Sequence, residues 1–126
     1  MELIQELEVW YIIPAIRKEI ALAMRERGLR QVEIAKILGI TKSAINQYIK
    51  DKRGSEFLLN KKMKEIILET STQIKNQQDT LKLIQHLMRI SREEKLACQI
   101  HKTLNKDFAE CGLCFEPLIS IGGRKQ

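Results

Sequence analysis

The sequence predicts an all-α fold on the basis of three observations. Only two Pro and six Gly occur among the 126 residues, so the chain has few of the turns that a β-sandwich requires. Leu, Ile, Lys, Glu and Gln are abundant, and most of them are strong helix formers. Apolar residues recur every three or four positions over much of the chain from residue 14 onward. The hydrophobic fraction of 44% is ordinary for a globular protein and argues against wholesale disorder.

The first element, residues 3–13, has two interpretations. Its apolar residues suit one face of a helix, but residues 9–13 also form a run typical of a strand. Pro14 either occupies the first turn of a helix, where its missing N–H costs nothing, or kinks a longer helix. From Pro14 the helical spacing is clear, and Gly28 is expected to end that helix.

Two short helices follow, predicted over residues 31–38 and 42–50. Gly39 ends the first, because a glycine tolerates the left-handed backbone of a tight turn. Thr41 precedes the second, where its hydroxyl can cap the helix. The residues expected to face inward from the first of the two are Val32, Ile34, Ala35 and Leu38.

A longer helical stretch extends from residue 56 to residue 90. Positions at alternating steps of four and three form a seam typical of packed helices, namely Met63, Ile67, Thr70, Ile74, Gln77, Leu81, Ile84 and Met88. Thr70 and Gln77 are polar, and the polar composition of residues 68–79 allows a break there. The same pattern fits two amphipathic helices folded onto the N-terminal domain and a seam between two chains, so both interpretations stay open.

The last third of the chain begins at a capping box. Ser91 is the expected N-cap of a further helix, with Glu94 reaching back to its N–H. Gly112, Pro117 and the Gly122–Gly123 pair predict turns and a tail after it. The expected organisation is an N-terminal helix-turn-helix domain over residues 1–57, a helical dimerisation or linker segment over 58–90, and a small Cys/His module over 91–126.

Charge and motif together single out the two short helices. Residues 25–55 contain eight Lys or Arg and three Asp or Glu, which is most of the net charge of +6. A turn at Gly39 between two short helices suits a pair in which the second helix enters the major groove of DNA. Capping by Thr41 leaves first-turn N–H groups able to face a phosphate.

This stretch resembles the Xre-type helix-turn-helix family of phage-repressor-like transcription regulators. The residues that carry the resemblance are Gln31, Glu33, Ile34, Ala35, Leu38, Gly39, Ile40, Thr41, Lys52, Arg53 and Gly54. It covers residues 14–55 and implies binding to double-stranded DNA. Gln31 resembles the family's backbone-clamping glutamine. A helix pair packed for structure alone would explain the apolar positions but not the polar run on the second helix.

The roles of the remaining polar residues follow from the geometry of a recognition helix. Its N-terminal end meets base edges, so Lys42 and Ser43 are candidates for base contact, as are Asn46 and Gln47 for adenine. The candidates for phosphate contact are Arg30, Lys50, Lys52 and Arg53. For Lys52 and Arg53, the alternative is a favourable charge at a helix C-terminus.

A second constellation lies near the end of the chain. Cys98 and His101 are three positions apart on a predicted helix, and Cys111 and Cys114 form a C-x-x-C turn. Three sulfur ligands and one nitrogen ligand suit a tetrahedral structural zinc site. An iron–sulfur cluster and ordinary packing without metal are the alternatives. An archaeal group of predicted Xre-type regulators looks similar, but it often has a further upstream C-x-x-C that this chain lacks, where only His86 is available.

The chain is therefore expected to be a transcription regulator that acts as a homodimer on DNA. No run of eighteen apolar residues and no secretory signal occur, so a cytoplasmic protein without a membrane span is expected. No nucleophile–base pair or phosphate-binding glycine loop stands out, so an enzyme is not expected. The alternative is an antitoxin-like or other protein-interaction module with secondary DNA binding.

Overall fold

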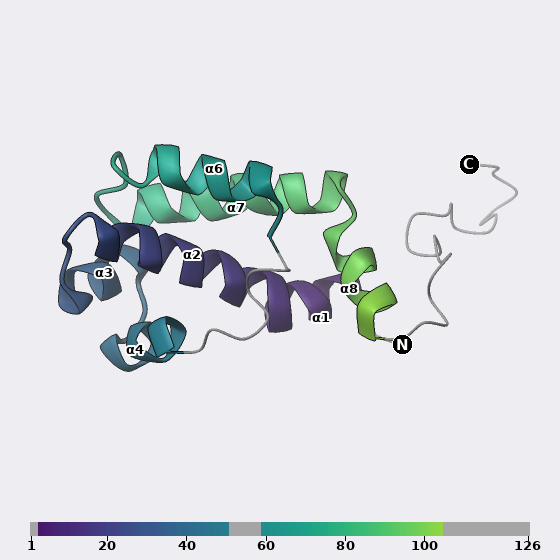
Figure 1. The fold of residues 1–126 in the computed structure, drawn as a ribbon, viewed down its shortest axis with the longest axis horizontal. Coiled ribbons are helices and arrows are strands. Elements are labelled where there is room, and N and C mark those ends of the chain that lie inside the picture. The colour runs from purple at the N-terminus through teal and green to yellow at the C-terminus, as the bar shows by residue number, and fades with distance from the viewer. Residues whose placement is uncertain (1–2, 51–58, 105–126) are drawn as a thin grey trace, which may run out of the picture.

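The computed structural model describes residues 3–50 and 59–104, and within these ranges all regular structure is helical, which confirms the all-α prediction. Figure 1 shows the arrangement. The elements are α1 (Ile4–Leu7), the π-helical segment η1 (Glu8–Ile12), α2 (Ile13–Glu26), α3 (Gln31–Leu38), α4 (Lys42–Lys50), α6 (Lys61–Thr70), α7 (Gln77–Glu93) and α8 (Leu96–Leu104).

The first three elements run on without a break, so the strand-like interpretation of residues 9–13 was wrong. Pro14 lies in the first turn of α2 and has no N–H to donate. The turn before it widens to the π spacing, in which the N–H of Ile13 donates to the carbonyl of Glu8, five residues back. The proline is thereby accommodated inside a long helical run.

Helix α2 is the centre of the molecule. In Figure 1, α6 and α7 lie along one side of α2, and α3 and α4 lie on the other. The buried apolar face of α2 consists of Ala15, Ile16, Ile20, Ala21, Ala23 and Met24. One hydrophobic core joins these residues to Leu7, Ile34, Ile67, Leu87 and Ile100. The three predicted segments, 1–57, 58–90 and 91–126, therefore contribute to a shared core.

Part of the predicted seam packs against other helices of the same chain. Helix α6 ends at Thr70, and α7 begins at Gln77, where the Asn76 side chain accepts a hydrogen bond from the N–H of Asp79 at 2.8 Å. The break therefore falls within residues 68–79. The seam residues Met63, Ile67, Ile74 and Met88 are buried against the chain's own helices. Leu81, by contrast, is 60% exposed.

The corner between α7 and α8 differs from the prediction. Ser91 was expected to cap a helix, but it lies inside α7 and is 1% exposed. The chain turns three residues later, at Glu94 and at Lys95, whose φ is 54°. A capping box is a local pattern, and here the continuation of α7 buries Ser91 among the core residues at its end.

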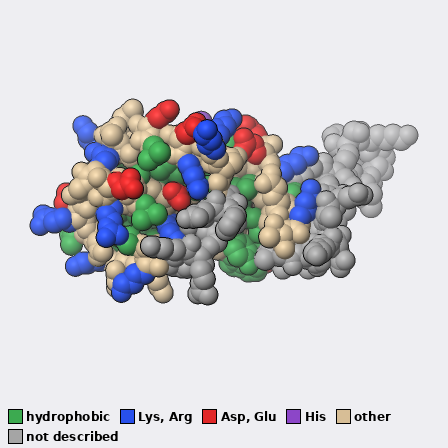
Figure 2. Space-filling model, in the orientation of Figure 1, with side chains coloured by type: hydrophobic (Ala, Val, Ile, Leu, Met, Phe, Trp, Pro, Cys, Tyr) green, Lys and Arg blue, Asp and Glu red, His purple; other side chains and the backbone are tan. Residues whose placement is uncertain are grey.

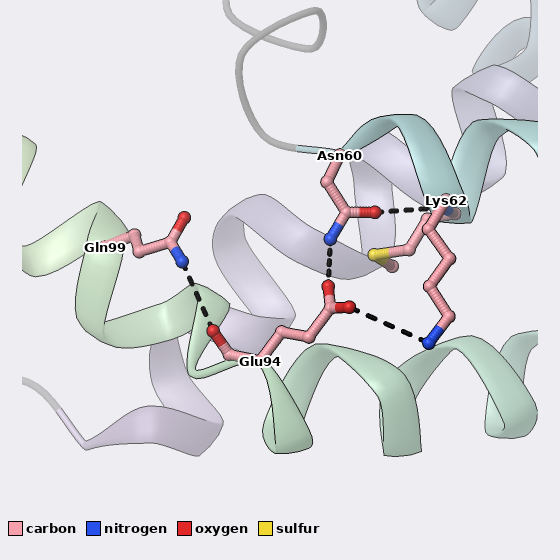
Figure 3. Close-up of polar contacts among 5 residues, drawn as sticks. Asn60, Lys62, Glu94 and Gln99 are labelled. Carbon is pink, nitrogen blue, oxygen red and sulfur yellow. Dashed lines mark hydrogen bonds and ion pairs between the residues drawn. The ribbon is translucent and has the colours of Figure 1, made fainter.

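Glu94 joins this corner to the start of α6 (Figure 3). Its carboxylate accepts a hydrogen bond from the Asn60 side chain and lies 3.9 Å from Lys62 Nζ, while its backbone carbonyl accepts from Gln99 Nε2 at 3.2 Å. Asn60 also caps α6, since its Oδ1 accepts from the N–H of Met63 at 2.9 Å. One carboxylate thus links α6 to the α7–α8 corner.

Three large apolar side chains are exposed on the N-terminal helices. Leu3, Val9 and Trp10 are 63%, 59% and 54% exposed, and Figure 2 shows hydrophobic side chains gathered over the position of α1. None of the helices in residues 3–50 and 59–104 combines the length and hydropathy needed to cross a bilayer.

Candidate nucleic-acid interface

Helix α3 has the predicted bounds, and both of its ends are defined by local contacts. At its start, the backbone N–H and the Nε of Arg30 each donate to Glu33 Oε1 at 3.3 Å. At its end, Gly39 adopts the left-handed conformation with φ 70°, and the N–H of Ile40 donates to the Ala35 carbonyl at 3.1 Å. The predicted turn at Gly39 is confirmed.

Helix α4 also begins where the sequence predicted, and it extends to Lys50, the last residue described before position 59. Thr41 Oγ1 accepts a hydrogen bond from the N–H of Ala44 at 3.1 Å, so the threonine is the N-cap. The backbone carbonyl of Thr41 accepts from the N–H of Ile45 at 3.1 Å. The first turn of α4 is therefore fixed by its own cap.

The two helices pack on each other and on α2 through a small buried set. Ile34, Ala35 and Leu38 of α3 and Ile45 of α4 are each less than 9% exposed. The prediction that Val32 faces inward was wrong, since it is 49% exposed. At about 100° per residue, Val32 lies about 160° around the helix from Ile34.

The structure presents the predicted contact residues along the outward side of α4. Lys42, Ser43 and Gln47 are exposed, and Asn46 is half-buried. These positions, separated by one and four residues, share one side of a helix. The other described candidates are Thr41 and Lys50, both exposed, and Gln31, half-buried at the start of α3. Lys52 and Arg53 lie outside the described residues.

Electrostatics at this end of the molecule are basic. Figure 2 shows Lys and Arg side chains around the end formed by α3 and α4. Arg30 is paired with Glu33 there, and the hydrogen bond from the Arg30 backbone N–H, followed by the one from its side chain, lowers the pKa of Glu33. The two hydrogen bonds from Arg30 to Glu33 hold the start of α3.

Sequence reasoning missed two contacts from α7 to the turn between α3 and α4. Thr80 Oγ1 lies 2.8 Å from the carbonyl oxygen of Ile37, and the Gln77 side chain packs over Gly39. These partners are separated by about 40 positions in the chain, so no local pattern could have indicated them. Beside the contact is a shallow hollow of about 290 Å³, lined in part by Arg17, Leu38, Leu81 and Ile84.

The structure describes two of the four Cys and His residues that were predicted to bind a metal. Cys98 and His101 lie one turn apart on α8 and are 8% and 5% exposed. Cys111 and Cys114 lie outside the described residues. Within residues 3–50 and 59–104, no three His, Cys, Asp or Glu side chains are grouped as metal ligands. Helix α8 therefore supplies one thiol and one imidazole, which is half of the predicted donor set.

Comparison with known proteins identifies the same segment. Residues 20–55 match the sequence model of the family described as Helix-turn-helix. The match begins within α2, includes all of α3 and α4, and covers less than a third of the chain. No curated protein and no solved structure gives a significant match.

Proposed function

We propose that the chain, whose residues 20–55 match the Helix-turn-helix family model, is a transcription regulator that reads double-stranded DNA in sequence-specific fashion. The supporting observation is α4 itself, which is capped by Thr41 and carries Lys42, Ser43, Asn46 and Gln47 on its outward side. In this proposal, residues 42–50 enter the major groove.

The proposed contact residues have different roles. Lys42 donates to guanine O6 or N7, and Asn46 or Gln47 pairs with the N6 and N7 positions of adenine. Lys50 and Arg30 contact phosphates, as do Lys52 and Arg53, which fixes the position of the protein without reading sequence. Gln31, at the N-terminus of α3, contacts the backbone on the flank of the site.

Selection from a random duplex pool tests the proposal. The full chain is expected to enrich a defined sequence, and its affinity for that duplex should fall with salt at roughly 0.9 log units per log unit for each phosphate contact. A chain that enriches no sequence, or whose binding does not depend on salt, would refute the proposal.

We further propose that the regulator is a homodimer, because one recognition helix reads too few bases for operator specificity. Leu81 is an exposed apolar residue of the seam and is available for a second chain, whereas Met63, Ile67 and Ile74 are buried. Leu81→Asp should then yield a monomer in light scattering without unfolding the chain. A wild-type chain that is already monomeric at micromolar concentration would contradict the dimer.

We also propose one zinc ion per chain, bound by Cys98, His101, Cys111 and Cys114. The spacing of Cys98 and His101 on one buried face of α8 fits two adjacent positions of a tetrahedral site. Metal analysis should find about one zinc per chain, reduced by Cys111→Ser and by His101→Ala. Brown colour with iron in place of zinc would favour a cluster, and absence of both metals would refute the site.

A protein-interaction module, such as an antitoxin that also binds DNA, is the second candidate. The exposed apolar side chains Leu3, Val9 and Trp10 favour it, because clusters of exposed apolar groups mark interaction surfaces. Under this alternative, a partner protein co-purifies with the wild-type chain and is lost from Trp10→Ser. Specific DNA binding by the isolated chain would then be weak.

A further inference from the structure

The carbonyl of Ile37 has an unusual partner. It is among the last four carbonyls of α3, which are beyond the reach of the helix's own N–H groups and need other donors. Thr80 supplies such a donor, because its Oγ1 lies 2.8 Å from the Ile37 carbonyl oxygen. Thr80 is buried, with only 2% of its surface exposed. The Asn76 carbonyl is also near this hydroxyl, at 3.2 Å, but a hydroxyl has a single proton and the shorter contact lies toward Ile37.

Gly39, two residues after Ile37, is the residue at which the chain turns from α3 toward α4. Gly39 has φ 70°, and a Cβ placed there would lie 3.0 Å from Gln77 Cδ. Gln77 and Thr80 belong to the first turn of α7, so two side chains from one turn contact both the end of α3 and the glycine. The direction in which α4 leaves α3 is therefore bounded by α7 as well as by α2.

A second link connects the same hairpin to the helix-turn-helix segment. The guanidinium of Arg27, just after the end of α2, donates to the carbonyl of Ser71 in the turn between α6 and α7. The α6–α7 hairpin is thus attached at the end of α2 and at the end of α3. A hairpin attached only by apolar packing could slide, whereas two directed hydrogen bonds define one position.

We propose that Thr80 is a positioning residue for DNA recognition. Helix α7, through the Thr80 hydroxyl on Ile37 and the Gln77 side chain on Gly39, holds α4 in the orientation that reads bases. The inference rests on the proposed function, since it needs a specific duplex to be read. It assigns to α7 a role in the affinity for DNA that is independent of any contact between α7 and the duplex.

Three substitutions separate this role from a general effect on folding. Thr80→Val keeps the shape of the side chain and removes the hydroxyl, while Thr80→Ser keeps the hydroxyl. Thr70→Val is the matched control, because the Thr70 hydroxyl donates to the Ile66 carbonyl of its own helix at 2.7 Å and does not reach α3. Each variant is titrated with the duplex that the wild-type chain selects from a random pool, and with an unrelated duplex of equal length.

The expected result is a loss of discrimination. Thr80→Val should bind the selected duplex about five-fold more weakly, the factor that corresponds to one hydrogen bond, with less than about a two-fold change on the unrelated duplex. Thr80→Ser should restore most of the loss, and Thr70→Val should bind as the wild-type chain does. Amide hydrogen exchange at Gly39 and Ile40 should be faster in Thr80→Val alone.

A failure of the inference can be distinguished from a failure of the proposed function. If Thr80→Val binds the selected duplex as Thr70→Val does, α7 does not position α4 and the inference is wrong, while the proposed function stands. If the wild-type chain selects no duplex, the proposed function fails and the inference fails with it. Should Thr80→Val not fold, Gln77→Ala at an exposed position replaces it. Equal binding by Gln77→Ala and the wild-type chain would then overturn the inference, and a loss of two-fold or more confined to the selected duplex would support it.

Discussion

Arg92 and Glu8, which are 84 positions apart in the sequence, form a bidentate ion pair. Arg92 Nε lies 2.9 Å from Glu8 Oε2, and Nη2 lies 3.0 Å from Oε1. The glutamate side chain is 5% exposed, whereas that of the arginine is 58% exposed, so the carboxylate depends on this partner more than the guanidinium does. The pair attaches the π-helical segment η1 to the end of α7, and it raises the pKa of Arg92 through the hydrogen bonds to Glu8.

Arg92→Ala should therefore destabilise the fold more than an ordinary surface change. It leaves a buried carboxylate without its donor, at a cost of about 2 kcal/mol in the free energy of unfolding, measured by urea denaturation. Lys61→Ala is the control, because the Lys61–Glu65 pair is exposed and 3.9 Å apart, and its loss should change stability by less than about 0.5 kcal/mol. Equal effects of the two changes would mean that the Glu8 pair is no stronger than a surface contact.

Asn46→Ala should relax the preference for one base position in the selected duplex. The loss of a paired contact to adenine is expected to cost about 1–3 kcal/mol at that position and little elsewhere. Lys50→Ala should weaken binding to all duplexes by a similar factor, because it removes a phosphate contact. Repeating the duplex selection with each variant makes the comparison. An unchanged preference in Asn46→Ala would place the reading surface away from α4.

Gly39→Ala should be more costly than Gly28→Ala. Both glycines have positive φ, at 70° and 93°, so an alanine at either position incurs backbone strain of about 1–2 kcal/mol. At Gly28 the added Cβ meets nothing within 4 Å, but at Gly39 it meets the Gln77 side chain. Urea denaturation should show an excess cost for Gly39→Ala that disappears in a Gln77→Ala background. An excess that persists there would assign the difference to strain alone.

The Glu33 carboxyl should titrate below its ordinary value of 4.5, because the Arg30 backbone N–H, and then the Arg30 side chain, hydrogen-bond the ionised form. A lowered folded-state pKa means that the stabilising contribution is present above the ordinary pKa and is lost as pH falls through the folded value. Carbon-detected NMR titration of the carboxyl measures it. Arg30→Ala should raise the pKa only in part, since the backbone donor remains. A wild-type value at or above 4.5 would show that this start of α3 is not formed in solution.

The part of the fold that sequence predicted well is the part with local causes. The end of α3 follows from Gly39, which needs a positive φ, and the start of α4 follows from Thr41, which caps its own helix. Both signals act within four residues. The end of α2 near Gly28 has the same origin.

Most of the wrong or missing predictions concern residues whose neighbours in the fold are far away in the sequence. Ser91 carries a valid capping pattern, yet α7 continues past it because the core at the end of that helix buries it. Val32 is an exception, because its place away from the buried face of α3 follows from local helical spacing, about 160° from Ile34. The contact between Thr80 and Ile37 was not predicted at all, because a threonine in an amphipathic helix gives no indication of which carbonyl it will meet. For the candidate site, the exposed residues of α4 were predicted from sequence, while their support from α7 required the structure.

The π-helical segment acts as a phase shift in the long N-terminal helix. A π turn contains about one residue more than an α turn, so residues before it are rotated by about 100° relative to an uninterrupted helix. This offset allows Leu7 to be fully buried and Glu8 to reach Arg92, while the adjacent Val9 and Trp10 remain in solvent. A chain shortened by one residue between Glu8 and Ile12 would keep its helical content. Its α1 would, however, be rotated about the helix axis so that a different side faced α8. The length of this one turn, rather than its composition, thus selects which side of the N-terminal helix the rest of the molecule covers.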